Sequence, residues 1–288
     1  MFANWRIGRP FGIDVFISGW FWLLPLIVFA TSFAAGGFDT AAFDTVSLLA
    51  LFGCVALHEL GHALAARGYG IRTRDITLYP IGGVARLERM PERPLAEMVI
   101  ALAGPAVNVV IALLVGGLLL GKHLVFGSGS VLGGGVVEAF LQRLALGNVV
   151  LVVFNMIPAF PMDGGRVLRA FLTLFTSRTT ATNIAGGVGT VFAVLFGLYG
   201  LATFNLLLVF LAMALFMMGR QEVLAVRQQE EWRRRQTAWA EAEEQWQARW
   251  GRGEPAGRTQ ADGWVFDADR DEWIEYRDGW PVRRFRQQ

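Results

Sequence analysis

The chain has 288 residues, of which 54% are hydrophobic and only 17% are charged, and its mean hydropathy is +0.42. Ordinary soluble domains carry about 25% charged residues, so this composition excludes a soluble globular protein and predicts a membrane protein with several spans. The formal net charge of +2 gives no reason to expect a nucleic-acid partner. A single cysteine, Cys54, excludes an intrachain disulfide.

Charged residues are distributed unevenly along the chain. They are sparse before position 220 and frequent from there to the C-terminal end. We therefore predict two domains, a transmembrane domain over residues 1–219 and a soluble cytoplasmic tail over residues 220–288. The first apolar run follows Arg6 and Arg9 and is long, so it is predicted to be a retained span rather than a cleaved signal peptide.

Six apolar runs are long enough to be membrane spans, for which about 20 residues are needed. The fourth run is the least regular, because Glu138, Gln142 and Arg143 lie near its start. The predicted fold class is an all-α polytopic membrane protein with about six transmembrane helices. The predicted spans are Phe16–Phe33, Val46–Ala66, Leu95–Leu120, Val136–Ile157, Ile184–Leu201 and Phe204–Gly219.

Arginines gather in alternate connections between these spans. The connection after the second span holds six of them, whereas the connections after the first and third spans hold none. Cytoplasmic connections are enriched in Lys and Arg, so both termini are predicted to be cytoplasmic in a multi-pass protein of the cell membrane. This orientation places His62 toward the cytoplasmic end of the second span.

The connection between the second and third spans has a strand-like pattern over residues 71–90. Polar and apolar residues alternate on both sides of a turn at Ile81-Gly82-Gly83, which is typical of a β-hairpin. Irregular backbone next to a bilayer is stable only where protein or a water-filled cavity satisfies its polar groups. An extended substrate strand can add to such a hairpin, so Gly82 and Gly83 are candidate substrate-binding residues.

The tail divides into a helical segment over residues 220–250, a Gly/Pro-rich linker over residues 251–261, and two or three short strands over residues 262–286. Tryptophans in the helical segment recur at helical spacing, so they share one face. A packed or interfacial stripe is the favoured interpretation, and it offers a surface for oligomer formation. The tryptophans are Trp232, Trp239, Trp246 and Trp250.

The most informative motif is His58-Glu59-Leu60-Gly61-His62, which lies inside the second predicted span. Ionisable residues at membrane depth are costly and mark functional sites. Residues four apart share a helical face, so His58 and His62 can offer two imidazoles to one metal ion. Glu59 is rotated about 100° from His58, close enough to act on a metal-bound water. A purely structural histidine pair would have to satisfy all three polar groups in lipid, so a zinc hydrolase is favoured.

A catalytic zinc site needs a third protein ligand. The remaining histidine, His123, lies at the far end of the third span, so the ligand is expected to be a carboxylate or Cys54. Asp163 is favoured because it follows the fourth span at the depth of His62. The prolines before it break the helix and the glycines after it allow close approach of the backbone. Taken alone, Asp163 has a strong alternative as the N-cap of the next helix.

Three motifs together resemble the site-2 proteases, the intramembrane zinc metalloproteases. They are His58-Glu59-x-x-His62, Gly104-Pro105-x-x-Asn108, and Asn155-x-x-Pro158 leading to Asp163-Gly164-Gly165. The segment over residues 79–86 is similar to the family's re-entrant hairpin, and the resemblance covers about residues 7–219. The chain departs from parts of the family: an inserted PDZ-like segment is missing, and the tail does not resemble the paired nucleotide-sensing domains of some members.

The resemblance implies an activity and a site. It implies regulated intramembrane proteolysis, in which transmembrane segments of membrane-anchored substrates are cleaved with one Zn²⁺ per chain. His58, His62 and Asp163 would ligate zinc, and Glu59 would be the catalytic base. Asn155 would polarise the scissile carbonyl or stabilise its oxyanion.

The third span also receives an implied role from the resemblance. Gly104, Pro105 and Asn108 would be structural and would let this span pack closely. The implied partners are the lipid bilayer and a single-span substrate protein, for example a membrane-bound regulator of transcription.

Two other interpretations stay open at this point. A prenylated-protein protease would use a glutamate from a later helix as the third ligand, and Glu138 is the candidate here. A membrane scaffold without catalysis would keep the motif for its shape, although it would have no need of Glu59. A di-iron desaturase is excluded because the chain has only three histidines.

Overall fold

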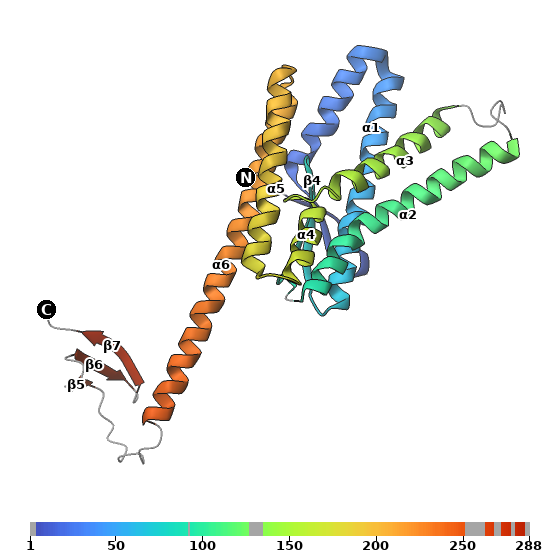
Figure 1. Ribbon diagram of the computed structural model, residues 1–288. Coiled ribbons are helices and arrows are strands. Elements are labelled where there is room, and N and C mark those ends of the chain that lie inside the picture. Colours follow the sequence, from blue (N-terminus) through green and yellow to red (C-terminus); the bar gives the residue numbers. More distant parts are fainter. Residues whose placement is uncertain are drawn as a thin grey trace. The chain divides into compact units, whose positions relative to one another are not determined.

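The chain folds into two compact units, Met1–Glu230 and Glu231–Gln288. Figure 1 shows the computed structural model, which describes residues 4–91, 93–126, 135–250, 263–267, 272–277 and 280–285. The predicted linker over residues 251–261 lies outside the described residues. All candidate site residues belong to the first unit. The boundary at position 220 between a transmembrane domain and a cytoplasmic tail stays a prediction.

Five helices among the described residues are long and apolar enough to cross a membrane. They agree with a multi-pass membrane protein, but they do not confirm the predicted count of six spans, because the first two predicted spans both fall on α1. The helices are α1 (Leu23–Gly68), α2 (Pro94–Phe126), α3 (Val136–Asn155), α5 (Arg178–Ala202) and α6 (Leu206–Trp250).

Helix α1 reverses direction at Gly37, where the backbone is not helical and φ is 78°. Glycine adopts this left-handed region without steric penalty. Ser32 Oγ donates to Asp44 Oδ2 at 2.6 Å, although residues 12 apart in a straight helix are separated by about 18 Å. Figure 1 shows the two antiparallel limbs. We call residues 23–36 the first limb and residues 38–68 the second limb.

The N-terminal residues form structure that the sequence pattern did not predict. Residues Asp14–Ile17 are strand β2 and Gly19–Trp22 form a 3-10 turn, so the first predicted span began too early. Strand β2 pairs in parallel with β3 (Thr73–Tyr79), and this pairing joins segments far apart in sequence. A short apolar run alone does not distinguish such a strand from the start of a helix.

A four-stranded sheet packs against the second limb of α1. Its order is β1 (Trp5–Gly8), β2, β3 and β4 (Gly82–Leu87). Strands β3 and β4 are antiparallel neighbours within the segment for which a hairpin was predicted, and β4 is one of the two outer strands. The predicted fold class, all-α apart from the hairpin and a small tail, was therefore too narrow: the protein is mostly helical and carries two small sheets.

Two apolar clusters hold this sheet beside the site. Ile13, Val15 and Ile76 of the sheet region are buried against Leu60 and Ala63 of α1. A second cluster joins Phe21, Phe52 and Leu78. Burial of each large apolar side chain contributes about 1.5–3 kcal/mol, so these clusters fix the hairpin next to the turns of α1 that carry the motif histidines.

A short helix, α4 (Asp163–Thr173), follows α3 and contacts both α2 and α5 (Figure 1). Buried Arg169 anchors it. The Arg169 Nε atom donates to Glu97 Oε1 of α2 at 2.6 Å, and Arg169 Nη1 lies 3.4 Å from Glu222 Oε1 of α6. These ion pairs fix the rotation of α4 and thereby the position of its first residue, Asp163.

The last predicted span and the predicted tail helix form one continuous helix, α6. Ala, Glu, Gln, Arg and Met are all good helix formers, so nothing interrupts the helix where its composition becomes polar. Trp232 and Trp239 are exposed on it, whereas the other two tryptophans of the stripe lie outside the described side chains. Strands β5 (Gly263–Asp267), β6 (Glu272–Arg277) and β7 (Trp280–Phe285) form an antiparallel sheet, in the segment for which short strands were predicted.

Candidate metal centre

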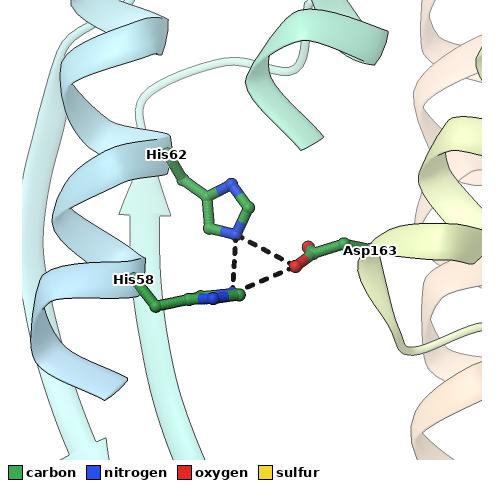
Figure 2. Close-up of side chains that lie close together, drawn as sticks. All are labelled: His58, His62 and Asp163. Atoms are coloured by element: carbon green, nitrogen blue, oxygen red, sulfur yellow. Dashed lines mark hydrogen bonds and ion pairs between the residues drawn. The ribbon is translucent and has the colours of Figure 1, made fainter. Parts of the chain in front are cut away.

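Three side chains from two helices converge on one point. His58 and His62 lie on the second limb of α1, and Asp163 is the first residue of α4. His58 Nε2 and His62 Nε2 lie 3.0 Å and 3.1 Å from Asp163 Oδ2, and 3.1 Å from each other. Figure 2 shows these three atoms facing one another. All three residues are buried.

The other ring nitrogen of each histidine is held by α2. His62 Nδ1 lies 2.7 Å from the carbonyl oxygen of Ile100, which can only accept, so Nδ1 of His62 carries the hydrogen. His58 Nδ1 lies 2.5 Å from Oδ1 of Asn108. In the neutral form of each ring, the lone pair is then on Nε2, and Nε2 is directed toward Asp163.

The Asp163 carboxyl group is held in its ionised form. Burial opposes ionisation, but where the imidazoles carry hydrogen on Nε2, hydrogen bonds from His58 and His62 lower the pKa of this carboxyl group, and the positive charges of His62 and Arg166 lower it further, below its ordinary value. Metal ligands must be deprotonated. The aspartate therefore meets this requirement, and the imidazoles meet it once they lose the proton on Nε2.

The donor set fits one zinc ion. Zinc binds histidine nitrogen at about 2.0–2.1 Å and carboxylate oxygen at about 2.0–2.2 Å, so tetrahedral ligands are separated by about 3.3 Å. The three atoms here are 3.0–3.1 Å apart. Two neutral imidazoles and a carboxylate in this arrangement present three lone pairs to each other, and a cation between them removes that repulsion.

Gly104 explains how α2 approaches the metal ligands so closely. A Cβ atom built at this position would overlap Nε2 of His62 and would lie 2.7 Å from Nε2 of His58. Ile100, Gly104 and Asn108 are four residues apart and therefore share the face of α2 that meets α1. The expectation that Gly104-Pro105-x-x-Asn108 allows close packing agrees with this geometry, and Asn108 in addition contacts a metal ligand.

Glu59 lies between the ligands and strand β4. Its Oε2 accepts a hydrogen bond from the backbone N–H of Ala85 at 3.1 Å. A Cβ atom on Gly83 would lie 2.5 Å from Cγ of Glu59, so glycine at position 83 makes room for this carboxylate. Gly82, the neighbouring candidate, has φ of 149°, which favours glycine for conformational reasons.

Asn155 and Glu59 line the same cavity. The cavity has a volume of about 310 Å³, and His58, Gly82 and Gly83 also line it. One N–H of the Asn155 amide donates to the carbonyl oxygen of Leu151 at 3.0 Å. An amide nitrogen has two hydrogens, and within the described part of the chain the second N–H and the side-chain oxygen have no hydrogen-bond partner, so both can meet a ligand.

The other candidate ligands lie elsewhere in the structure. Glu138, at the start of α3, forms an ion pair with Lys122 at 2.5 Å. His123 is exposed in the last turn of α2. Cys54 is buried, and its Sγ lies 3.4 Å from Nδ2 of Asn148. None of the three belongs to the group of potential metal ligands found among the described residues, so Asp163 is the carboxylate that the geometry selects.

Sequence reasoning missed Asn148, Arg169 and the Ala85 backbone N–H. Asn148 is a polar residue in an apolar helix, seven positions before Asn155 and thus on nearly the same face, which was an available signal. A backbone donor cannot be recognised from sequence, because it depends on which strand lies beside Glu59.

Comparisons with known proteins identify the family of the chain. Residues 46–128 and 122–196 match the family model of Peptidase family M50. A zinc metalloprotease of Methanocaldococcus jannaschii is 32% identical over 217 residues, which are 75% of this chain and 60% of that protein. Stage IV sporulation protein FB of Bacillus subtilis is 29% identical over 183 residues, 61% of this chain and 59% of that protein.

A solved structure is similar as well. The Site-2 Protease from Methanocaldococcus jannaschii has a TM-score of 0.56 and 32% identity, covering 77% of this chain and 95% of that chain. The chain thus spans about 60% of the length of the two relatives above and nearly all of the solved protease. Since the family model also matches more than half of its residues, the chain belongs to peptidase family M50, the site-2 protease family.

Proposed function

We propose that this protein is an intramembrane zinc metalloprotease that cleaves transmembrane segments of membrane-anchored substrate proteins. His58, His62 and Asp163 are the proposed zinc ligands. The observation that carries the proposal is that two imidazole Nε2 atoms and Oδ2 of the aspartate lie within 3.1 Å of one another. Glu59 directly follows the first of these histidines on an apolar helix. Family membership supports the same reading.

The proposed chemistry is hydrolysis of a peptide bond. When bound, zinc supplies Lewis acidity that polarises a carbonyl and lowers the pKa of water. Glu59 accepts a proton from the attacking water, whose oxygen forms a bond to the carbonyl carbon. Glu59 then returns the proton to the amide nitrogen as the C–N bond breaks. Its place in the 310 Å³ cavity beside His58 supports this role.

Asn155 is the proposed stabiliser of the developing negative charge. Its second amide N–H is free to donate to the carbonyl oxygen of the scissile bond as that oxygen becomes an oxyanion. Donors fixed in advance in a water-poor site act strongly on such a charge. The hydrogen bond of Asn155 to Leu151 supports the role because it holds the amide in one orientation.

Strand β4 is the proposed receptor for an unwound substrate. It is one of the two outer strands of its sheet, so its free edge can pair with an extended peptide. Two cavities border it: the 310 Å³ cavity next to Gly82 and Gly83, and one of about 420 Å³ next to Ala85 and Leu87. Together they support a substrate path along β4 and past Glu59.

The membrane arrangement belongs to the same proposal. Each limb of α1 crosses the bilayer once, which gives six crossings in total and places both termini in the cytoplasm. The hairpin of β3 and β4 is re-entrant, and the cell membrane is the proposed location. The reversal at Gly37 supports two crossings by α1, and the arginine-rich connection after α1 supports the orientation.

The proposed substrates are single-span membrane proteins, with membrane-bound regulators of transcription as the first class to test. Cleavage near the cytoplasmic side would release such a regulator into the cytoplasm, which is regulated intramembrane proteolysis. The exposed Trp232 and Trp239 of α6 are candidates for contacts between copies of the chain.

Comparison of cells that carry the wild type with cells that carry Glu59→Gln tests this proposal. Membrane-protein fragments are identified by mass spectrometry in both strains, and His123→Ala serves as the control. The expected result is a set of membrane-derived fragments that is lost in Glu59→Gln and retained in His123→Ala. Identical fragments in all three strains would mean that the chain is a scaffold or acts on other substrates.

A further inference from the structure

Two asparagine side chains are buried behind the proposed zinc ligands. Asn108 of α2 and Asn148 of α3 are both fully buried, and Asn108 Nδ2 donates to Asn148 Oδ1 at 2.7 Å. On its other side, Asn108 Oδ1 lies 2.5 Å from His58 Nδ1. Burial of an amide is costly unless its hydrogen bonds are made. Apolar side chains could fill the same space without this cost, so packing alone does not explain why two amides are buried here.

A backbone carbonyl fixes the direction of this chain of hydrogen bonds. Asn148 contacts the carbonyl oxygen of Leu144, one turn earlier on α3, at 2.8 Å. Because a carbonyl oxygen only accepts, Asn148 must direct Nδ2 toward Leu144 and Oδ1 toward Asn108. Asn108 must then direct Nδ2 toward Asn148 and Oδ1 toward His58. The donor in the last hydrogen bond is therefore Nδ1 of His58.

We propose that Asn148 is a positioning residue for the metal centre: through Asn108 it holds His58 in the tautomer with hydrogen on Nδ1, which leaves the Nε2 lone pair for zinc. This inference rests on the proposed zinc site. His62 needs no such relay, because its Nδ1 donates directly to the Ile100 carbonyl at 2.7 Å. The two histidines reach the same tautomer by different routes, one through the main chain and one through side chains of two further helices.

The relay matters because the side-chain amide of asparagine has an acceptor oxygen at one end and a donor NH₂ group at the other. Without Asn148, the Asn108 amide can rotate by 180°, so that its NH₂ group faces Nδ1 of His58. That orientation favours hydrogen on Nε2 and opposes ligation. Removal of a hydrogen-bond partner that orients a metal ligand typically weakens metal affinity about 10- to 100-fold. A carboxylate at position 108 has two acceptor oxygens, so it accepts from His58 in either orientation.

The first experiment measures the zinc dissociation constant of the purified full-length protein in detergent, by competition with a chelating dye. We expect Asn148→Leu to bind zinc about 10- to 100-fold more weakly than the wild type. Two controls should bind as the wild type does. Gln142→Leu removes an exposed amide of the same helix that, among the residues the structure describes, bonds Glu138 alone. Cys54→Ala removes the weak sulfur contact of Asn148 but leaves the Leu144 carbonyl.

The decisive experiment repeats the comparison in an Asn108→Asp background. We expect Asn148→Leu to change the zinc dissociation constant less than about threefold there, because the carboxylate no longer needs to be oriented. An equal loss in both backgrounds would show a packing effect and overturn the inference. If Asn148→Leu does not fold, Asn148→Ala makes the same comparison with a smaller side chain.

The outcomes also separate this inference from the proposed function. Failure of the wild-type protein to bind zinc would overturn both. Tight zinc binding by the wild type and equally tight binding by Asn148→Leu would overturn only the role of Asn148.

Discussion

The carboxylate of Glu59 and the backbone N–H of Ala85 are hydrogen-bonded at 3.1 Å. This bond couples the proposed base, on α1, to the strand proposed to receive the substrate. A peptide that pairs with the free edge of β4 uses outward-facing N–H groups of that strand. It therefore competes with Glu59 for the Ala85 N–H, and pairing would release the carboxylate into the cavity that it shares with His58 and Asn155.

A methyl group at position 83 should impair catalysis without removing zinc. In Gly83→Ala the new Cβ would lie 2.5 Å from Cγ of Glu59, so the carboxylate must move. Misplacement of a catalytic group by about 1 Å can cost about 10²-fold in rate. We expect kcat to fall by about that factor while the zinc content stays at one per chain.

A glycine of α1, Gly53, provides the control for Gly83→Ala. Gly53 has no atom within 4 Å of an added Cβ, so Gly53→Ala should leave both kcat and zinc content unchanged. Equal kcat values for Gly83→Ala and the wild type would mean that Glu59 does not need its present position.

Gly104→Ala should affect the metal rather than the base. The added methyl group would occupy the space of the imidazole of His62 and contact that of His58. Overpacking of this kind costs about 1–3 kcal/mol, which corresponds to a zinc affinity about 5- to 150-fold weaker. The measurement is chelator competition, and Gly116→Ala on the same helix is the matched control because an added Cβ there meets nothing within 4 Å.

Replacement of the two rival carboxylates should identify the third ligand. Asp163→Ala removes an oxygen that lies 3.0 Å and 3.1 Å from the two imidazoles, so we expect zinc to be lost at micromolar free zinc. Glu138→Ala breaks the ion pair with Lys122 and the hydrogen bond from Gln142, neither of which involves a proposed metal ligand, so zinc content, measured by atomic emission, should stay at one per chain. The reverse pattern would favour the arrangement of a prenylated-protein protease.

Arg169→Met should destabilise the first unit. It leaves the buried carboxylate of Glu97 without its nearest partner, which lies at 2.5 Å. Loss of one member of a buried pair costs about 3–5 kcal/mol. We expect a loss near the lower value, because Arg178 also lies 3.3 Å from Glu97.

Chemical denaturation in detergent measures the cost of Arg169→Met. Arg6→Met is the control, since Arg6 pairs with Asp14 at the surface and such pairs contribute about 1 kcal/mol or less. An equal effect of the two substitutions would contradict the anchoring of α4 by Arg169.

The sequence predicted those parts of the site that depend on local spacing. His58 and His62 meet because they are four residues apart on a helix, and Asp163 was selected by its depth in the membrane. The β3–β4 hairpin was predicted from alternation around Gly82 and Gly83. Each of these signals lies within a few residues or follows from membrane depth.

What the sequence did not predict depends on pairing between distant segments. The parallel pairing of β2 with β3 joins Asp14–Ile17 to residues that follow α1, and no local pattern specifies such a partner. Likewise, the role of Gly83 beside Glu59 exists only once β4 lies against α1. The continuity of α6 was missed because a change in composition, without a helix breaker, does not end a helix.

The most direct test of the central claim is cleavage of a single-span substrate by the purified protein in lipid vesicles, with zinc measured in the same samples. The wild type should contain one zinc per chain and cut within the transmembrane segment. Glu59→Gln should keep its zinc and lose about 10²- to 10⁴-fold in rate, which is the usual contribution of a general base. Cleavage by Glu59→Gln at the wild-type rate, with zinc bound, would contradict the assignment of Glu59 and the protease mechanism built on it.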